Sequence, residues 1–253
     1  PERHGIRHDK PFDPLGRSGD GWYWYAGDIR VPTLWDAARG RGLSAASVDW
    51  PVTVGAEISY DIAQYWRADT PGAPDSAKLA RAMSTKGLLA EAERSLGPYP
   101  AGFACGIEDD ERRAKFAAYL LERGQPRLLL SYFCSLDQAR HGGDPERAQV
   151  SSVLERLDAV VGRLRAAAER AGGGQAMVAV VSDHGFTVTD RELDLNAVLR
   201  NAGLLQIDAL GRTRGWRAVA WGHGGGAAIV LRDTRDEDAR RAARTALRTL
   251  TEA

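Results

Sequence analysis

The stretch Leu128-Leu129-Leu130-Ser131-Tyr132-Phe133-Cys134 is short and almost wholly apolar, and it decides the fold class. A second stretch of the same kind is Met177-Val178-Ala179-Val180-Val181. Such runs are typical of strands that are buried on both faces, as in a parallel sheet covered by helices. We therefore predict an α/β fold with three layers, in which helices cover both faces of a mostly parallel sheet.

A well-defined helix pattern separates the two runs. Asp144 is its predicted N-cap and Pro145 its first helical residue. Apolar residues then recur every three or four positions until Gly172-Gly173-Gly174 ends the pattern: Val150, Val153, Leu154, Leu157, Val160, Val161 and Leu164. A strand, a helix and a second strand in this order favour parallel pairing with a right-handed crossover.

Each apolar run is followed by a cluster of residues that can bind a metal ion. Asp137 and His141 are four positions apart, so one turn of helix can aim both at one ion. Asp183 and His184 are adjacent and would point to opposite faces of a regular strand, so the strand must end before them, with Gly185 supplying the turn. In open α/β sheets, functional groups gather beyond the carboxyl ends of the strands.

The mixture of oxygen and nitrogen donors indicates which metal to expect. Carboxylates together with imidazoles suit zinc, manganese or iron, whereas calcium and magnesium prefer oxygen almost exclusively. Zinc is our first choice. For either cluster taken alone, a helix-capping aspartate beside a solvated loop histidine is the competing interpretation.

The composition indicates a globular protein. The chain has 253 residues, of which 43% are hydrophobic, enough for one large α/β domain or two small ones. Its 34 Lys and Arg balance its 34 Asp and Glu, so its net charge gives no reason to expect binding to a nucleic-acid duplex. No apolar stretch approaches the roughly eighteen residues of a membrane span. Cys105 and Cys134 are interpreted as buried thiols rather than a disulfide.

Further elements are predicted along the chain. The helices expected are 32–39, 76–95, 109–122, 195–203 and one from Asp236, and the strands are 45–48 and 227–231. We interpret the helices between 75 and 124 as a small cap over the sheet.

The order of the motifs resembles the type I phosphodiesterase / nucleotide pyrophosphatase family of the alkaline phosphatase superfamily. The pieces that carry the resemblance, besides the two ligand clusters, are His4-Gly5-Ile6, Phe12-Asp13-Pro14, Pro32-x-Leu34-Trp35 and Trp50-Pro51. They cover nearly the whole chain. The resemblance implies one alkaline phosphatase-like catalytic domain over residues 1–253.

The resemblance also implies a reaction. Asp137 and His141 would bind one zinc ion, and Asp183 and His184 would bind a second. Two ions about 4 Å apart can activate an attacking oxygen and stabilise charge on a phosphoryl group. Family members use a threonine, or sometimes a serine, as the nucleophile and form a covalent phospho-enzyme. The implied substrate is a small phosphate ester such as a nucleotide.

The chain departs from the family pattern at both ends. The nucleophile and one aspartate ligand normally lie upstream of the segment that matches residues 1–6, and a further histidine ligand lies downstream of the strand matching 225–229. We therefore expect the chain to be the truncated middle of the fold and to be inactive alone. Thr33 and Thr53 lie outside the nucleophile motif, so no catalytic nucleophile is assigned. His223 is interpreted as a loop histidine rather than the missing ligand.

Asp9 is a candidate substrate-binding residue. It falls where many family members carry an asparagine that hydrogen-bonds the substrate phosphate. A carboxylate would repel a phosphate unless it were protonated or metal-bound, whereas an amide can donate hydrogen bonds. The alternative is that Asp9 is a turn residue and the alignment slips by one position.

Two other functions compete with the phosphodiesterase. The same ligands serve superfamily enzymes that cleave phosphomonoesters, phosphonates or sulfate esters. The chain is also open to interpretation as an inactive interaction domain that keeps the hydrolase fold, because fold alone does not establish function.

Overall fold

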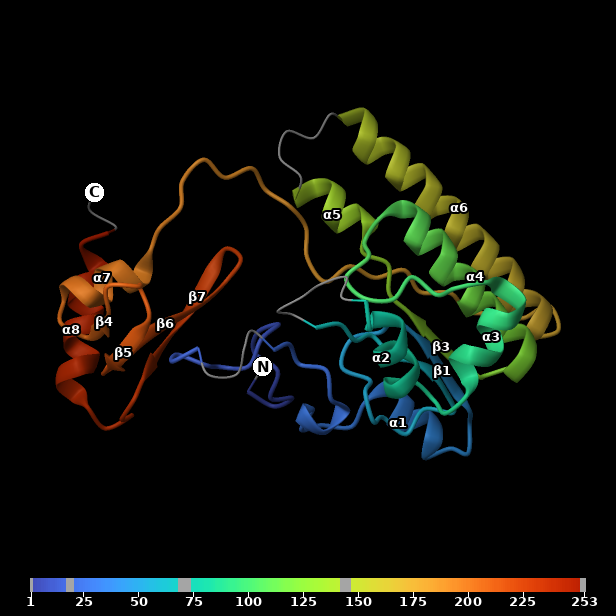
Figure 1. Cartoon of the computed structure of the whole chain (residues 1–253), viewed down its shortest axis with the longest axis horizontal. Helices are drawn as coiled ribbons and strands as arrows, with labels where there is room; N and C mark the ends of the chain where they lie inside the picture. Colours follow the sequence, from blue (N-terminus) through green and yellow to red (C-terminus); the bar gives the residue numbers. More distant parts are fainter. Residues whose placement is uncertain (1, 17–20, 68–73, 142–146, 251–253) are drawn as a thin grey trace. The chain divides into compact units, whose positions relative to one another are not determined.

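The computed structural model describes residues 2–16, 21–67, 74–141 and 147–250 (Figure 1). Contacts divide the chain into two compact units. The first contains Pro1–Arg7 and Tyr23–Phe186, and the second contains His8–Trp22 and Thr187–Ala253. Both units are parts of the chain that we predict as one domain.

A three-stranded parallel sheet forms the centre of the first unit, with the strand order β2-β1-β3. In the middle strand, Val48 lies opposite Ile62 on one side and Ser131 on the other, so the carboxyl ends of all three strands meet at one edge. The strands are β1 (Ala45–Val48), β2 (Tyr60–Ile62) and β3 (Leu128–Ser131). The predicted strands at 45–48 and in the leucine run are therefore confirmed.

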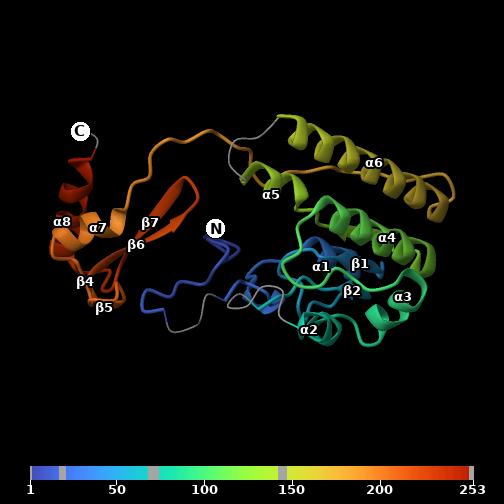
Figure 2. The same ribbon diagram turned by 45° about the horizontal axis from the view of Figure 1, so that its top comes forward.

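Helices cover both faces of this sheet, which confirms the predicted α/β class (Figure 2). Ala46 and Val48 pack against α2, α3 and α4, whereas Ala45, on the opposite face, packs with Trp35 of α1. The helices interpreted as a cap thus supply most of the core over one face. The helices of this unit are η1 (Ala26–Asp28, 3-10), α1 (Leu34–Arg39), α2 (Ser76–Met83), α3 (Leu88–Leu96), α4 (Ile107–Gly124), α5 (Ser135–His141) and α6 (Arg147–Ala171).

Several helices differ from the sequence prediction at their ends. The helix predicted over 76–95 is two helices, because Gly87 adopts a left-handed conformation (φ 78°) between them. Helix α1 begins after Thr33, which caps it by exchanging hydrogen bonds with Asp36. The predicted N-cap Asp144 lies outside the described residues.

The long helix α6 lies along α4 (Figures 1 and 2). Val160 is fully buried between them and their neighbours, and Arg156 forms ion pairs of 2.7 and 2.8 Å with Glu108 and Glu111 of α4. Amphipathic spacing therefore predicted this helix, although Leu154, one of its predicted apolar positions, is 54% exposed.

The second predicted strand of the βαβ unit does not form. Residues 175–194 contain no helix or strand, and the side chains of Met177, Val180 and Val181 are 98%, 73% and 75% exposed. A strand requires a hydrogen-bonding neighbour. Within the part of the chain that the structure describes, β3 pairs only with β1, and the run at 177–181 has no partner strand.

The two cysteines form a disulfide, so the prediction of buried thiols was wrong. Cys105, in the loop before α4, is bonded to Cys134, just before α5, with 5.2 Å between their Cα atoms. The two residues are 29 positions apart, and their pairing depends on the loop reaching the end of β3. Neither spacing nor composition contains that information.

In its described residues, the second unit combines two small antiparallel sheets with two helices. Its core contains Leu199, Leu204, Ala218 and Ala239, and Phe12 packs edge-on against Trp216 with 5.7 Å between ring centres. The elements are α7 (Leu195–Asn201), β4 (Leu205–Ile207), β5 (Thr213–Trp216), β6 (Ala218–His223), β7 (Gly226–Leu231) and α8 (Glu237–Arg248). The helix from 195, the strand at 227–231 and the final helix were predicted, and the other strands were missed. In the described residues, no helix is both long and apolar enough to cross a bilayer.

A carboxyl group is buried within the sheet of the first unit. Asp61 of β2 is only 4% exposed, and one of its oxygens has no hydrogen-bond partner among the described residues. Burial raises the pKa of Asp61 from 3.8 to about 7, against the smaller opposing effects of the Ser47 and Thr53 hydroxyls. Between pH 3.8 and about pH 7, Asp61 is therefore protonated in the folded protein and ionised in the unfolded chain.

We predict that this carboxyl group makes the protein less stable as the pH rises. Because its folded pKa exceeds its unfolded value, the stabilising effect is complete below pH 3.8 and is lost as the pH rises through about 7. Asp61→Asn should abolish this pH dependence, which amounts to a change on the order of a few kcal/mol in the free energy of unfolding. Urea unfolding at several pH values checks this, with Asp28→Asn, at an exposed carboxylate, as the control. Equal pH slopes for Asp61→Asn and the unchanged protein would contradict it.

We also predict that the disulfide is structural. In denaturant without reductant, iodoacetamide should add no mass, and after reduction it should add two adducts, because the chain has only two cysteines. The double variant Cys105→Ala/Cys134→Ala should lose about 2–4 kcal/mol of unfolding free energy. Alkylation before reduction, in protein prepared without reductant, would show that the thiols are free.

Candidate metal centre

In the first unit, the two predicted histidine ligands approach one carboxylate oxygen, Oδ1 of Asp137, and Asp183 lies beside His184. The Nε2 atom of His141 is 3.5 Å from Asp137 Oδ1, and the Nε2 atom of His184 is 3.7 Å from the same oxygen. His184 Nε2 also lies 3.7 Å from Asp183 Oδ2. Imidazoles from two segments that are more than forty positions apart in the sequence thus meet at Asp137.

Two structural elements bring these side chains together. Helix α5 carries Asp137 and His141 one turn apart, as their spacing predicts. Asp183 and His184 lie in an irregular segment, where the alternation of a strand does not separate them. Within this segment, Asp183 Oδ1 accepts a hydrogen bond from the His184 backbone N–H (3.0 Å), and Ser182 Oγ donates one to the His184 carbonyl (2.6 Å).

The donors suit a zinc-like ion, although they do not form a complete shell. The Asp137 side chain is half-buried, but its Oδ1 atom is buried and has no hydrogen-bond partner in the described residues, which is unusual for a buried oxygen. Two ligands of a tetrahedral zinc ion lie about 3.3 Å apart when each is about 2.0 Å from it, close to the separations seen here. Among the residues that the structure describes, however, no three His, Cys, Asp or Glu side chains surround one point as ion ligands.

Phe186 packs against both histidines, a role that the sequence did not reveal. Its ring meets those of His141 and His184 at steep angles, with centres 5.0 and 5.4 Å apart. The Arg140 guanidinium lies over the same ring, 5.7 Å from its centre. Phe186 therefore limits the orientations that the two imidazoles can adopt. Its place two residues after His184 is the only sequence signal for it.

The carboxyl end of β3 is a region of negative charge. Burial and, to a smaller extent, neighbouring carboxylates together raise the pKa of Tyr132 to about 12. These carboxylates are, in decreasing order of effect, Asp183, Asp137, Asp49 and Asp110. The phenol stays protonated. Asp49 and Asp110 pair with the buried Arg113, so Asp183 and Asp137 are the carboxylates whose charge favours a bound cation.

The other residues singled out by sequence belong elsewhere. Asp9 is exposed and lies in the second unit, and its role in binding substrate stays a prediction. His223 is the last residue of β6, opposite Gly226, rather than part of a longer loop. Thr33 caps α1, and Thr53 is buried and donates a hydrogen bond to the Trp50 carbonyl, so both have structural roles.

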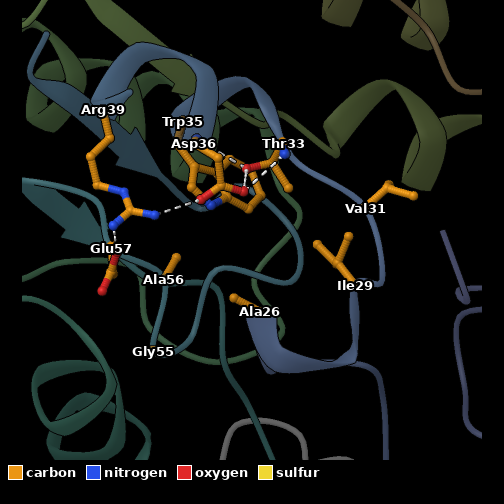
Figure 3. Close-up of a pocket in the computed structure, with 10 residues that line it drawn as sticks. All are labelled: Ala26, Ile29, Val31, Thr33, Trp35, Asp36, Arg39, Gly55, Ala56 and Glu57. Atoms are coloured by element: carbon orange, nitrogen blue, oxygen red, sulfur yellow. Dashed lines mark hydrogen bonds and ion pairs between the residues drawn. The ribbon is translucent and has the colours of Figure 1, made fainter. Parts of the chain in front are cut away.

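A pocket of about 250 Å³ lies beside α1, and it contains none of the four predicted ligands (Figure 3). Its charged side chains pair with one another: Arg39 contacts Asp36 (3.5 Å) and Glu57. Asp36 in turn accepts hydrogen bonds from Thr33. Because these groups satisfy one another, the pocket offers no chemistry that competes with the cluster at Asp137.

Comparison with known proteins identifies the family. A search of curated proteins found no match. The family model for type I phosphodiesterase / nucleotide pyrophosphatase matches residues 1–252, essentially the whole chain. The α/β architecture of the first unit agrees with this match. The chain belongs to the type I phosphodiesterase / nucleotide pyrophosphatase family.

Proposed function

We propose that this protein hydrolyses phosphodiester or pyrophosphate bonds in small phosphate esters such as nucleotides, and that the reaction depends on two divalent ions, with zinc preferred. Family membership supports a phosphoester hydrolase. One observation supports the dependence on metal ions: the imidazoles of His141 and His184 approach Asp137 Oδ1, which accepts no hydrogen bond in the described residues.

The proposal assigns a role to each of the four side chains. Asp137 and His141 would hold one ion, and Asp183 and His184 would hold the other. When bound, such ions activate an attacking oxygen and neutralise charge on the phosphoryl group. Side-chain exposures of 38% for Asp137 and 52% for His184 leave the cluster open to ions and to substrate.

The chain's own residues prepare this site. The ring of Phe186 keeps both imidazoles turned toward Asp137. Asp183 and Asp137, the two carboxylates near Tyr132 that have no arginine partner in the described residues, supply negative charge that offsets the removal of water from a divalent cation. We assign no nucleophile among the residues of this chain, and the role of Asp9 toward the phosphate is part of the proposal.

The metal content gives the first test. Protein expressed from its complete reading frame should contain about two zinc-like ions per chain by elemental analysis. Asp183→Asn should lower that content, because an amide oxygen is a much weaker ligand than a carboxylate. Asp190→Asn makes the same change at an exposed carboxylate nearby and should leave the content unchanged. Absence of metal, with activity unaffected by a chelator, would contradict the proposal.

A panel of nitrophenyl esters gives the second test. We predict that the diester and the nucleotide ester are hydrolysed faster than the phosphomonoester, the phosphonate or the sulfate. His184→Ala should lower kcat/KM by more than about 100-fold, since even outer partners of ligands are worth about 10–100-fold. Preference for the monoester, phosphonate or sulfate would favour another chemistry of the superfamily. No turnover of any ester, without bound metal, would favour an interaction domain.

A further inference from the structure

A network of buried charges lies behind the ligand cluster. Arg113 of α4 is 1% exposed, and its guanidinium contacts two carboxylates. Its Nη1 atom donates a hydrogen bond of 2.9 Å to Asp110 Oδ1, and its Nε atom is 2.9 Å from Asp49 Oδ2, an ion pair without hydrogen-bond geometry. Asp49 directly follows β1, and its other oxygen accepts a hydrogen bond from the Tyr99 hydroxyl (3.2 Å).

The second oxygen of Asp110 reaches the next helix. Asp110 Oδ2 accepts a hydrogen bond of 2.8 Å from the backbone N–H of Ser135, the first residue of α5. The first N–H groups of a helix have no partner inside the helix, and a negative charge beside them is favourable. Asp110 and Ser135 are both buried, so water does not compete for this hydrogen bond.

A disulfide ties the start of α5 to the loop before α4, and a hydrogen bond from Arg113 ties that loop to α4 itself. Cys134, the residue before Ser135, is bonded to Cys105. Arg113 Nη2 donates a hydrogen bond of 2.5 Å to the carbonyl of Ala104, the residue before that cysteine. The start of α5 therefore has little freedom, and Asp137 lies only two residues further along, in the first turn of the helix.

We infer that Asp110, held in place by Arg113, is a positioning residue for Asp137. By fixing the first turn of α5, it sets the point at which the Asp137 carboxylate meets the imidazoles of His141 and His184. The effect of Asp110 on metal binding rests on the proposed function, whereas its effect on the stability of the first turn of α5 does not. The charge of Asp110 is required because a buried guanidinium that loses one of its carboxylates is left partly unpaired.

Hydrogen exchange of the full chain, followed by mass spectrometry, tests the effect on α5. In Asp110→Asn, the amides of residues 135–141 should exchange about tenfold faster or more, because a buried charge-assisted hydrogen bond is weakened. Asp109→Asn is the matched control: Asp109 caps α4 by accepting a hydrogen bond from the Gly106 N–H (2.9 Å), and it should leave those amides unchanged. Unchanged exchange in folded Asp110→Asn would overturn the inference.

A second variant keeps the test decisive if Asp110→Asn does not fold. Ser135→Pro removes the N–H that Asp110 accepts from, and proline is tolerated at the first position of a helix. It also removes the Ser135 hydroxyl, which makes no hydrogen bond in the described residues. The charge network stays intact in this variant. Faster exchange over 136–141 supports the positioning role, and wild-type exchange overturns it.

Cobalt(II) titration tests the consequence for the ligand cluster. The Co²⁺ affinity of Asp110→Asn should fall about 10–100-fold, with a changed visible absorption spectrum. Leu89→Ala, in the core of α3, should lower Tm but leave the affinity unchanged. An equal loss of affinity in Leu89→Ala would show that Asp110 acts only through stability and would overturn its positioning role. If the unaltered chain binds no Co²⁺, the proposed function fails, and the exchange experiment alone decides the role of Asp110.

Discussion

Arg113 connects three elements of the first unit through its pairing with Asp49 and Asp110. Asp49 marks the end of β1, Arg113 and Asp110 belong to α4, and Asp110 hydrogen-bonds the first residue of α5. A buried pair of this kind adds little stability compared with apolar packing, but it is costly to break, because the remaining charge would be buried without a partner. We therefore interpret it as a constraint on geometry. It fixes how the helix that carries Asp137 leaves the sheet.

The candidate centre depends on this constraint and on the parallel sheet. Parallel strands bring their carboxyl ends to one edge, and there α5 and the segment at 182–186 meet. Neither segment could place a ligand accurately alone, since α5 has only seven residues and the other segment is irregular. The disulfide and the Asp110 hydrogen bond hold the start of α5. The ring of Phe186 contacts His141 of α5 and His184 of the irregular segment.

Sequence patterns predicted the parts of the fold that depend on local spacing. The strands at 45–48 and 128–131, the long helix α6 and the final helix α8 follow from apolar periodicity, and the spacing of Asp137 and His141 placed them on one helical turn. Features that depend on distant partners were missed. The disulfide, the Asp110–Ser135 hydrogen bond and the packing of Phe186 each join segments whose proximity only the folded chain creates. The apolar run at 177–181 was predicted as a strand from its composition alone. It forms none in the described residues, because a strand needs a neighbouring strand to pair with.

The proposed function depends on Asp137, His141, Asp183 and His184 acting as metal ligands. Anomalous diffraction at the zinc absorption edge, from crystals of the protein grown with zinc, tests it most directly. We expect anomalous peaks about 2.0–2.2 Å from the Asp137 carboxylate and from the imidazole nitrogens of the two histidines. Zinc peaks only at other side chains, with these four residues unliganded, would contradict it.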